Sequence, residues 1–143
     1  MFEDLVLMGS VGSDIHSVAN QLLEKELNDK GFKVLNLGVA APVDEWVKLI
    51  ILERPFLVLI GSMNGDLSPI LELVTEINQL EQFEGHIIVG GNLKLGSRGN
   101  TISELLEAKN VIVMKENQPS FYEISEICRK LYLGREVLNQ THA

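Results

Sequence analysis

Apolar residues along the chain fall into short runs that alternate with stretches of helical spacing. The short runs, which predict strands, are 5–8, 32–37, 56–60, 86–89 and 111–114. The third of these is apolar without interruption, which is typical of a strand covered on both faces. Between the runs, apolar residues recur three or four positions apart. This spacing predicts helices at 17–30, from 42 through 50, at 67–80, from 101 and from 120.

Strand and helix alternate along the whole chain, which predicts an α/β fold. We expect a Rossmann-like (flavodoxin-like) doubly wound sheet of five parallel strands, with helices on both faces. A single domain is expected over 1–143, with about the last eight residues as a tail. Ligands of such sheets bind beyond the carboxyl ends of the strands. The loops after the first, third and fourth strands are therefore the candidate site.

Composition narrows the class of function. The chain has 143 residues, with 20 acidic against 12 basic side chains and a formal charge of −8. This charge disfavours nucleic acid as a partner. No apolar run is long enough to cross a bilayer and no signal peptide is recognisable, so we expect a cytoplasmic protein without a membrane partner. One domain of this size leaves little room for both a cofactor site and an enclosed substrate chamber.

The loop after the first strand, Gly9 to His16, is small, polar and rich in glycine. It matches neither a phosphate-binding Walker loop nor the dinucleotide-binding glycine pattern. One interpretation is a simple turn whose Ser13 or Asp14 caps the next helix. The other is that Asp14 orients the imidazole of His16 as a metal ligand. Taken alone, His16 is better explained as a surface histidine, but a single protein ligand suits a metal that arrives with its other ligands in place.

Other chemically capable residues have simpler interpretations. Gly90 and Gly91 end a strand, where they form a tight turn or let a flat ligand approach the backbone. Cys128 falls among apolar residues at helical spacing and is expected to be buried and inert. His86 at a strand start and His142 in the tail have no metal-binding setting. Phe32 and Trp46 are interpreted as core or partner-contact residues.

Taken together, the three loops resemble the cobalamin (B12)-binding domain family. The family pattern is Asp-x-His-x-x-Gly after the first strand, Ser-x-Leu or Ser-x-Thr after the third, and Gly-Gly after the fourth. The corresponding segments here are Asp14–Ala19, Gly61–Met63 and Gly90–Gly91. The resemblance covers nearly the whole chain and is closest to the small, cobalamin-binding subunits of glutamate (methylaspartate) mutases. Asn20 and Asn36–Val39 also match residues of those subunits. The first strand starts close to the N-terminus without the helical cap of methyl-carrier relatives, which favours the mutase type.

The resemblance implies adenosylcobalamin as the cofactor, with its nucleotide tail displaced from cobalt and held in a pocket of the sheet domain. His16 is then the cobalt ligand, and Asp14 is its hydrogen-bonded partner. The corrin is lined by Ser13, Ile15 and Ser17. The remaining cofactor-binding residues, around the tail, are Ala19, Gly61, Ser62, Met63, Gly90, Gly91, Asn92, Leu93, Lys94, Leu95 and Gly96.

The implied function is that of the cobalamin-binding subunit of an adenosylcobalamin-dependent carbon-skeleton mutase, an isomerase that interconverts L-glutamate and 3-methylaspartate by a radical mechanism. Substrate residues then belong to a larger TIM-barrel subunit in a heterotetramer, and no catalytic residue is expected on this chain. A non-catalytic cobalamin carrier or sensor acting on a partner is the alternative. A flavodoxin-like or receiver-like domain without cobalamin fits the fold but gives no reason for Asp14 and His16 beside Gly90 and Gly91.

The chain departs from the family pattern at three positions. Ala19 replaces the glycine of the first motif, and Gly61 and Met63 replace the serine and leucine of the second. The resemblance implies that the serine hydroxyl of the family forms a hydrogen bond with a nitrogen of the tail base. Gly61 has no hydroxyl to form this bond. The loss of one neutral hydrogen bond costs roughly 0.5–1.5 kcal/mol, so weaker tail binding is expected, with a divergent role or a different lower base as the alternatives.

Overall fold

The computed structural model describes residues 4–11, 17–62, 68–91, 110–114 and 121–142, with the backbone alone for Ser17, Ser62, Gly91 and 135–142. The strands are β1 (Leu5–Ser10), β2 (Lys33–Asn36), β3 (Leu57–Ser62), β4 (His86–Gly91) and β5 (Val111–Val113). The helices are α1 (Ser17–Asp29), α2 (Val43–Glu53), α3 (Ser68–Asn78) and α5 (Phe121–His142). The helix predicted from Thr101 lies outside the described residues.

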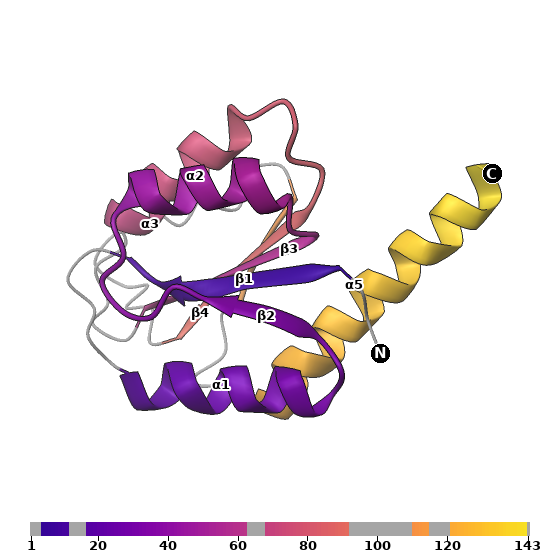
Figure 1. Cartoon of the computed structure of the whole chain (residues 1–143), viewed down its shortest axis with the longest axis horizontal. Coiled ribbons are helices and arrows are strands. Elements are labelled where there is room, and N and C mark those ends of the chain that lie inside the picture. Colours follow the sequence, from indigo (N-terminus) through magenta and orange to yellow (C-terminus); the bar gives the residue numbers. More distant parts are fainter. Residues whose placement is uncertain (1–3, 12–16, 63–67, 92–109, 115–120, 143) are drawn as a thin grey trace.

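The strands form one parallel sheet in the order β2-β1-β3-β4-β5, which confirms the predicted doubly wound architecture. Helices α2 and α3 cover one face of the sheet, and α1 and α5 lie on the other (Figure 1). The yellow end of α5 projects beyond the rest of the fold. Helix α5 continues to His142, through the segment expected as a tail, and the domain bounds 1–143 stay a prediction. None of the described helices is both long and apolar enough to span a bilayer.

Three strands run further than the apolar pattern predicted. Strand β1 continues through Gly9 and Ser10, which pair with Ile60 and Gly61 of β3. Strand β3 in turn continues to Ser62, whose partner is the last residue of β4. A parallel ladder is made by backbone groups, so it extends past the last apolar side chain into glycine and serine. The sheet therefore reaches into the loops that were singled out as the candidate site.

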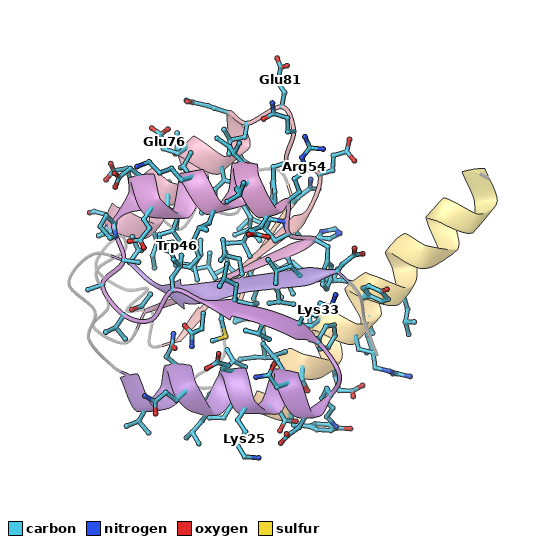
Figure 2. All side chains as sticks on the ribbon, in the orientation of Figure 1. Lys25, Lys33, Trp46, Arg54, Glu76 and Glu81 are labelled. Carbon is cyan, nitrogen blue, oxygen red and sulfur yellow. The ribbon has the colours of Figure 1, made fainter. Side chains whose placement is uncertain are left out.

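The face of the sheet beneath α2 and α3 is closely packed around Trp46. This side chain is fully buried and points from α2 toward the sheet (Figure 2). Gly9 lies opposite it: a Cβ on Gly9 would come within 2.9 Å of the Gly38 carbonyl oxygen and 3.2 Å of Trp46 Cζ2. The glycine at position 9 is therefore needed for packing on this face. The indole N–H of Trp46 has no acceptor among the described residues, an arrangement that typically costs about 1–3 kcal/mol.

The opposite face is packed by α1 and α5 around an aromatic group. Phe32 stacks on Phe56 at 6.2 Å between ring centroids, and Tyr132 of α5 meets Phe56 edge-on at 5.4 Å. Leu27 is the fully buried residue of α1 on this side. These contacts gather where Phe56 leads into β3, so they tie both helices to the amino-terminal half of the sheet. The burial of Phe32 and Trp46 confirms that both are core residues.

Cys128 of α5 also belongs to this second core, as predicted. It is fully buried, and desolvation raises the pKa of its thiol from 9.0 to about 12. Stability gained by burying the neutral thiol is present below the ordinary pKa of 9.0 and is lost as the pH rises through about 12.

We expect the thiol of Cys128 in the native protein to resist a disulfide reagent such as DTNB at pH 8. A pKa of about 12 leaves roughly one thiolate in ten thousand at that pH, and the side chain is inaccessible. The same reagent in 6 M guanidinium should label one thiol per chain at the rate of a free cysteine, which serves as the internal control. Rapid stoichiometric labelling of the folded chain would contradict this burial.

Candidate functional site

The candidate site lies at the carboxyl edge of the central strands. Strands β1, β3 and β4 are neighbours, and all three end at the same edge because the sheet is parallel. Within the sheet, β2 lies next to β1 on one side, whereas β3, β4 and β5 follow one another on the other side of β1. The switch point therefore falls between β1 and β3, where ligands of open α/β sheets bind.

One row across this edge carries almost no side-chain bulk. Ser10, Gly61 and Gly90 are register partners on the three adjacent strands. Side chains alternate between faces along a strand, and Leu59 and Ile88, two residues earlier, pack in the core beneath α1 and α5. Gly61 and Gly90 therefore face the α1 side of the sheet. Beyond the core side chains of Leu59 and Ile88, the two glycines add no side chain on that face, and we refer to this row as the step.

The surroundings of the two glycines differ. The nearest described atom to a Cβ built on Gly61 would be the Gly9 carbonyl oxygen, at 3.8 Å. A Cβ on Gly90 would meet Met114 Cγ at 3.4 Å and Met114 Cβ at 3.5 Å. Backbone strain does not require glycine at either position, since neither has a positive φ. Among described atoms, Met114 borders the step at Gly90, and Gly61 is its roomier part.

Ser10 holds the neighbouring loop against the end of β1. Its N–H donates to the Gly38 carbonyl oxygen at 3.0 Å, and its carbonyl oxygen accepts from Ala41 N–H at 3.0 Å. Its hydroxyl oxygen accepts from Ala40 N–H at 3.1 Å. Ala40 has a φ of 55°, in the left-handed region that alanine rarely adopts. Three hydrogen bonds from one buried residue thus fix the β2–α2 loop beside the site.

The structure brings several predicted site residues to this edge. Ser17 and Ala19 lie in the first turn of α1, Gly61 and Ser62 end β3, and Gly90 and Gly91 end β4. The other predicted residues lie outside the described ranges: Ser13, Asp14, Ile15, His16, Met63, Asn92, Leu93, Lys94, Leu95 and Gly96. The pairing of Asp14 with His16 stays a prediction. His86 begins β4 at the opposite edge, as expected.

Sequence reasoning missed two residues at the site, Ser10 and Met114. Ser10 falls in the loop from Gly9 to His16 and Met114 at the end of the fifth apolar run, but neither is among the predicted site residues. Each lies two residues beyond a core residue of the same strand or its extension, Met8 or Ile112. Extending the two-residue alternation through the glycines would have placed both on the α1 side. Among the described residues, no three His, Cys, Asp or Glu side chains gather as metal ligands.

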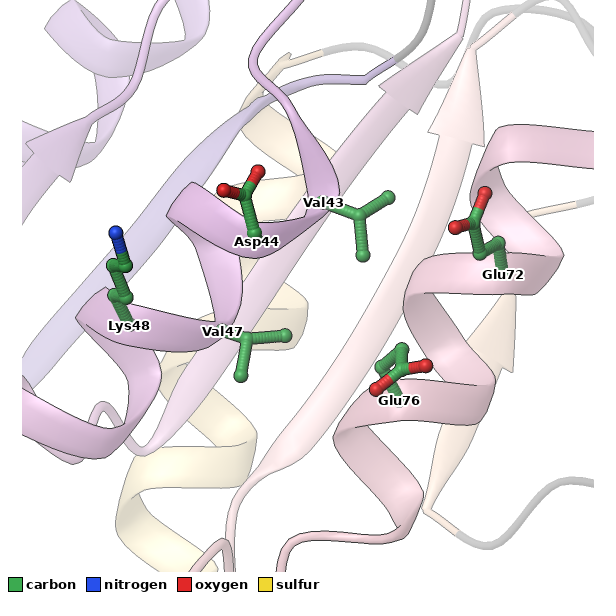
Figure 3. A pocket seen from close by; sticks show the side chains of 6 residues that line it. All are labelled: Val43, Asp44, Val47, Lys48, Glu72 and Glu76. Atoms are coloured by element: carbon green, nitrogen blue, oxygen red, sulfur yellow. The ribbon is translucent and has the colours of Figure 1, made fainter.

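A separate groove of about 660 Å³ lies between α2 and α3. Val43 and Val47 point into it from α2, and Glu72 and Glu76 lie along α3 (Figure 3). Asp44 and Lys48 complete its rim. None of the predicted site residues lines this groove, which lies on the face of the sheet opposite to Gly61 and Gly90.

Comparison with known proteins relates this geometry to a family. Residues 5–117 match the model of the B12 binding domain. The chain is 33% identical over 102 residues to the glutamate mutase sigma subunit of Carboxydothermus hydrogenoformans, an alignment that covers 68% of this chain and 72% of that one.

Solved structures share the fold at lower identity. A cobalamin-binding protein of Desulfitobacterium hafniense superposes with a TM-score of 0.71 at 18% identity, over 90% of this chain and 59% of that chain. The signal receiver domain of NarL from Mycobacterium tuberculosis superposes with a TM-score of 0.63 at 14% identity, over 94% of this chain and 99% of that one. Fold alone therefore does not separate cobalamin binders from receivers, but the family model does. Because that model spans most of the chain, the protein belongs to the B12-binding domain family.

Proposed function

We propose that this chain binds adenosylcobalamin and is the cofactor-binding subunit of a carbon-skeleton mutase that interconverts L-glutamate and 3-methylaspartate. Membership of the B12-binding family supports the cofactor class. The curated relatives named glutamate mutase sigma subunit support the mutase assignment. The proposal includes a cytoplasmic location, where the free thiol of Cys128 stays reduced.

The observation that carries the proposal is the row of Ser10, Gly61 and Gly90 at the switch point. A long, narrow nucleotide tail needs a slot beside the sheet, and we place this slot over the two adjacent glycines, which add no side chain there. The slot faces α1, the helix that follows the predicted cobalt ligand along the chain. The residues present therefore fit a cobalamin, even though the serine hydroxyl of the family pattern is missing at Gly61.

In this proposal the residues of the chain bind and orient, and none transfers a proton or bonds to substrate. His16 would hold cobalt through one ring nitrogen, and Asp14 would accept a hydrogen bond from the other, which would fix the tautomer. Gly61–Met63 and Asn92–Gly96 would flank the tail, and Ser13, Ile15 and Ser17 would line the corrin. When bound, adenosylcobalamin supplies the radical chemistry. A larger TIM-barrel subunit, in a heterotetramer, supplies the substrate-binding residues.

We expect cob(II)alamin bound to the ¹⁵N-labelled protein to show superhyperfine coupling to a protein nitrogen in electron paramagnetic resonance. Replacement of His16 by glycine should abolish this coupling and leave the far-ultraviolet circular dichroism unchanged. His86→Gln is the matched control, because His86 lies at the opposite edge of the sheet, and it should retain the coupling. Bound cobalamin without any protein-nitrogen coupling would eliminate His16 as the ligand.

Gly61 tests whether the tail occupies the slot in the sheet. Gly61→Leu should weaken cobalamin binding by about 5- to 150-fold, since filling a packed site costs about 1–3 kcal/mol. Gly61→Ser restores the hydroxyl of the family pattern and should strengthen binding by up to about tenfold. Dissociation constants are measured by titrating the apoprotein and following the corrin absorbance. Ile60→Val is the control, because it shortens a side chain on the opposite face of the sheet, and it should leave the affinity unchanged. Wild-type affinity in Gly61→Leu would show that the tail does not bind beside Gly61.

The mutase assignment is tested by adding the catalytic subunit of a related glutamate mutase. We expect the mixture with adenosylcobalamin to interconvert glutamate and 3-methylaspartate, monitored by nuclear magnetic resonance of the products. The same mixture with His16→Gly serves as the control and should be strongly impaired. Tight cobalamin binding without turnover, when tested with several such catalytic subunits, would instead favour a carrier or sensor.

A further inference from the structure

We propose that Asn36 is a positioning residue that holds the start of α1, the helix that follows the histidine segment (12–16) in the sequence, against the carboxyl edge of β1. Asn36 is the last residue of β2 and lies at the same edge as the candidate site. The part of this inference that concerns cobalamin rests on the proposed function. The part that concerns α1 does not, and it can be tested on the protein without cofactor.

The side chain of Asn36 joins three elements of the fold. Its Oδ1 accepts from Gly38 N–H at 2.8 Å, which closes the turn after β2. Its Nδ2 donates to Asn20 Oδ1 and, at 3.3 Å, to Glu24 Oε1, one turn further along α1. One amide therefore connects β2, the β2–α2 loop and the first two turns of α1. We refer to Asn20, Glu24 and Asn36 as the amide clamp.

The amide clamp continues to the end of β1 through the loop that it fixes. Gly38, which adopts a left-handed φ of 81°, directs its carbonyl oxygen to Ser10 N–H at 3.0 Å. Asn20 Nδ2 also approaches this oxygen, at 3.5 Å. Ser10 is the register partner of Gly61. A continuous chain of polar contacts thus links the helix after the histidine segment to the row of small residues where the tail is proposed to bind.

Among the described residues, no apolar side chain from the first turn of α1 belongs to either core. Val18 and Leu22, on the first two turns, are 68% and 48% exposed. The described apolar anchors of α1 come later, at Leu23 and the fully buried Leu27. Among the described side chains of the first turn, Asn20 is the one that bonds to another element. Because the described part of the chain provides no apolar anchor for this turn, we assign its position to the hydrogen bonds of the clamp.

The consequence concerns the ordering cost of cofactor binding. His16 is four residues before Asn20, so a fixed first turn restricts where the backbone of the histidine segment enters the site. A site that is already ordered loses less conformational entropy when it binds. Removal of the clamp should therefore weaken cobalamin binding and reduce the fraction of cobalt held by protein nitrogen, without a change in the residues that touch the cofactor.

The test compares three variants of the full chain with wild type. Asn36→Ala removes all three contacts, whereas Asn36→Asp keeps the acceptor for Gly38 N–H and loses the donor toward α1. Asn36→Asp combined with Glu24→Gln restores a donor–acceptor pair with the polarity reversed. Lys25→Ala is the control, because Lys25 pairs with Asp29 at 2.8 Å on the exposed side of α1 and points away from the sheet (Figure 2).

Hydrogen exchange of the apoprotein is the first readout. In Asn36→Ala and Asn36→Asp, we expect amides near the start of α1 to exchange about tenfold faster, while those around Leu27 and in β3 are unchanged. The second readout is the binding of cob(II)alamin. In the same two variants, we expect the affinity to be about tenfold weaker and the superhyperfine signal from protein nitrogen to be smaller. The double variant should recover both toward wild type, and Lys25→Ala should alter neither.

Two results would overturn the proposal. One is wild-type exchange and wild-type affinity in Asn36→Ala. The other is a uniform acceleration of exchange in every element, which would make Asn36 a residue of general stability. A wild-type chain that binds no cobalamin would refute the proposed function instead, and the exchange comparison would still decide the role of the clamp.

Discussion

The parallel register that aligns Ser10, Gly61 and Gly90 is the constraint on which the candidate site depends. Hydrogen bonds of the ladder fix the relative heights of β1, β3 and β4, so a shift of any strand by one residue would turn its side chains to the other face. Ile60 or Ser62 would then stand where Gly61 stands. The buried apolar residues of the three strands oppose such a shift, because each has a place in one of the two cores. The core therefore keeps Ser10, Gly61 and Gly90 aligned at the carboxyl edge.

The two faces of the sheet differ in how they are closed near this edge. On the α2 side, Trp46 and the Gly38 carbonyl oxygen leave no room for a Cβ on Gly9. On the α1 side, the buried aromatic contacts gather at the opposite end of the sheet, around Phe56 and Tyr132. Stability is thus concentrated on one face and at the amino-terminal edge. The region between α1 and the carboxyl ends of the strands differs, because small residues occupy the sheet positions there.

Much of the fold follows from sequence because its signals are local. The uninterrupted apolar run before Gly61 predicted a strand buried on both faces, and it is β3. The predicted helix end at residue 30 and helix start at residue 42 fall within one residue of the observed bounds of α1 and α2. Gly31 and Pro42 at these positions each favour a backbone conformation found at helix ends. The site was predictable only as a set of loops. That Gly61 and Gly90 are register partners, or that Asn36 bonds to Asn20, depends on contacts between residues distant in sequence, which no local pattern encodes.

The two walls of the proposed slot are held by different forces, and this difference bears on the missing hydroxyl at Gly61. The sheet wall is fixed by backbone ladders and buried side chains, so it barely adjusts to a ligand. The α1 wall is held by a few part-buried hydrogen bonds around Asn36, each with a net contribution of about 0.5–1.5 kcal/mol. A hydrogen bond lost on the rigid wall is comparable in free energy to one clamp contact on the adjustable wall. If the proposed roles hold, ordering of α1 before binding would offset a loss of the size expected from the missing hydroxyl at Gly61.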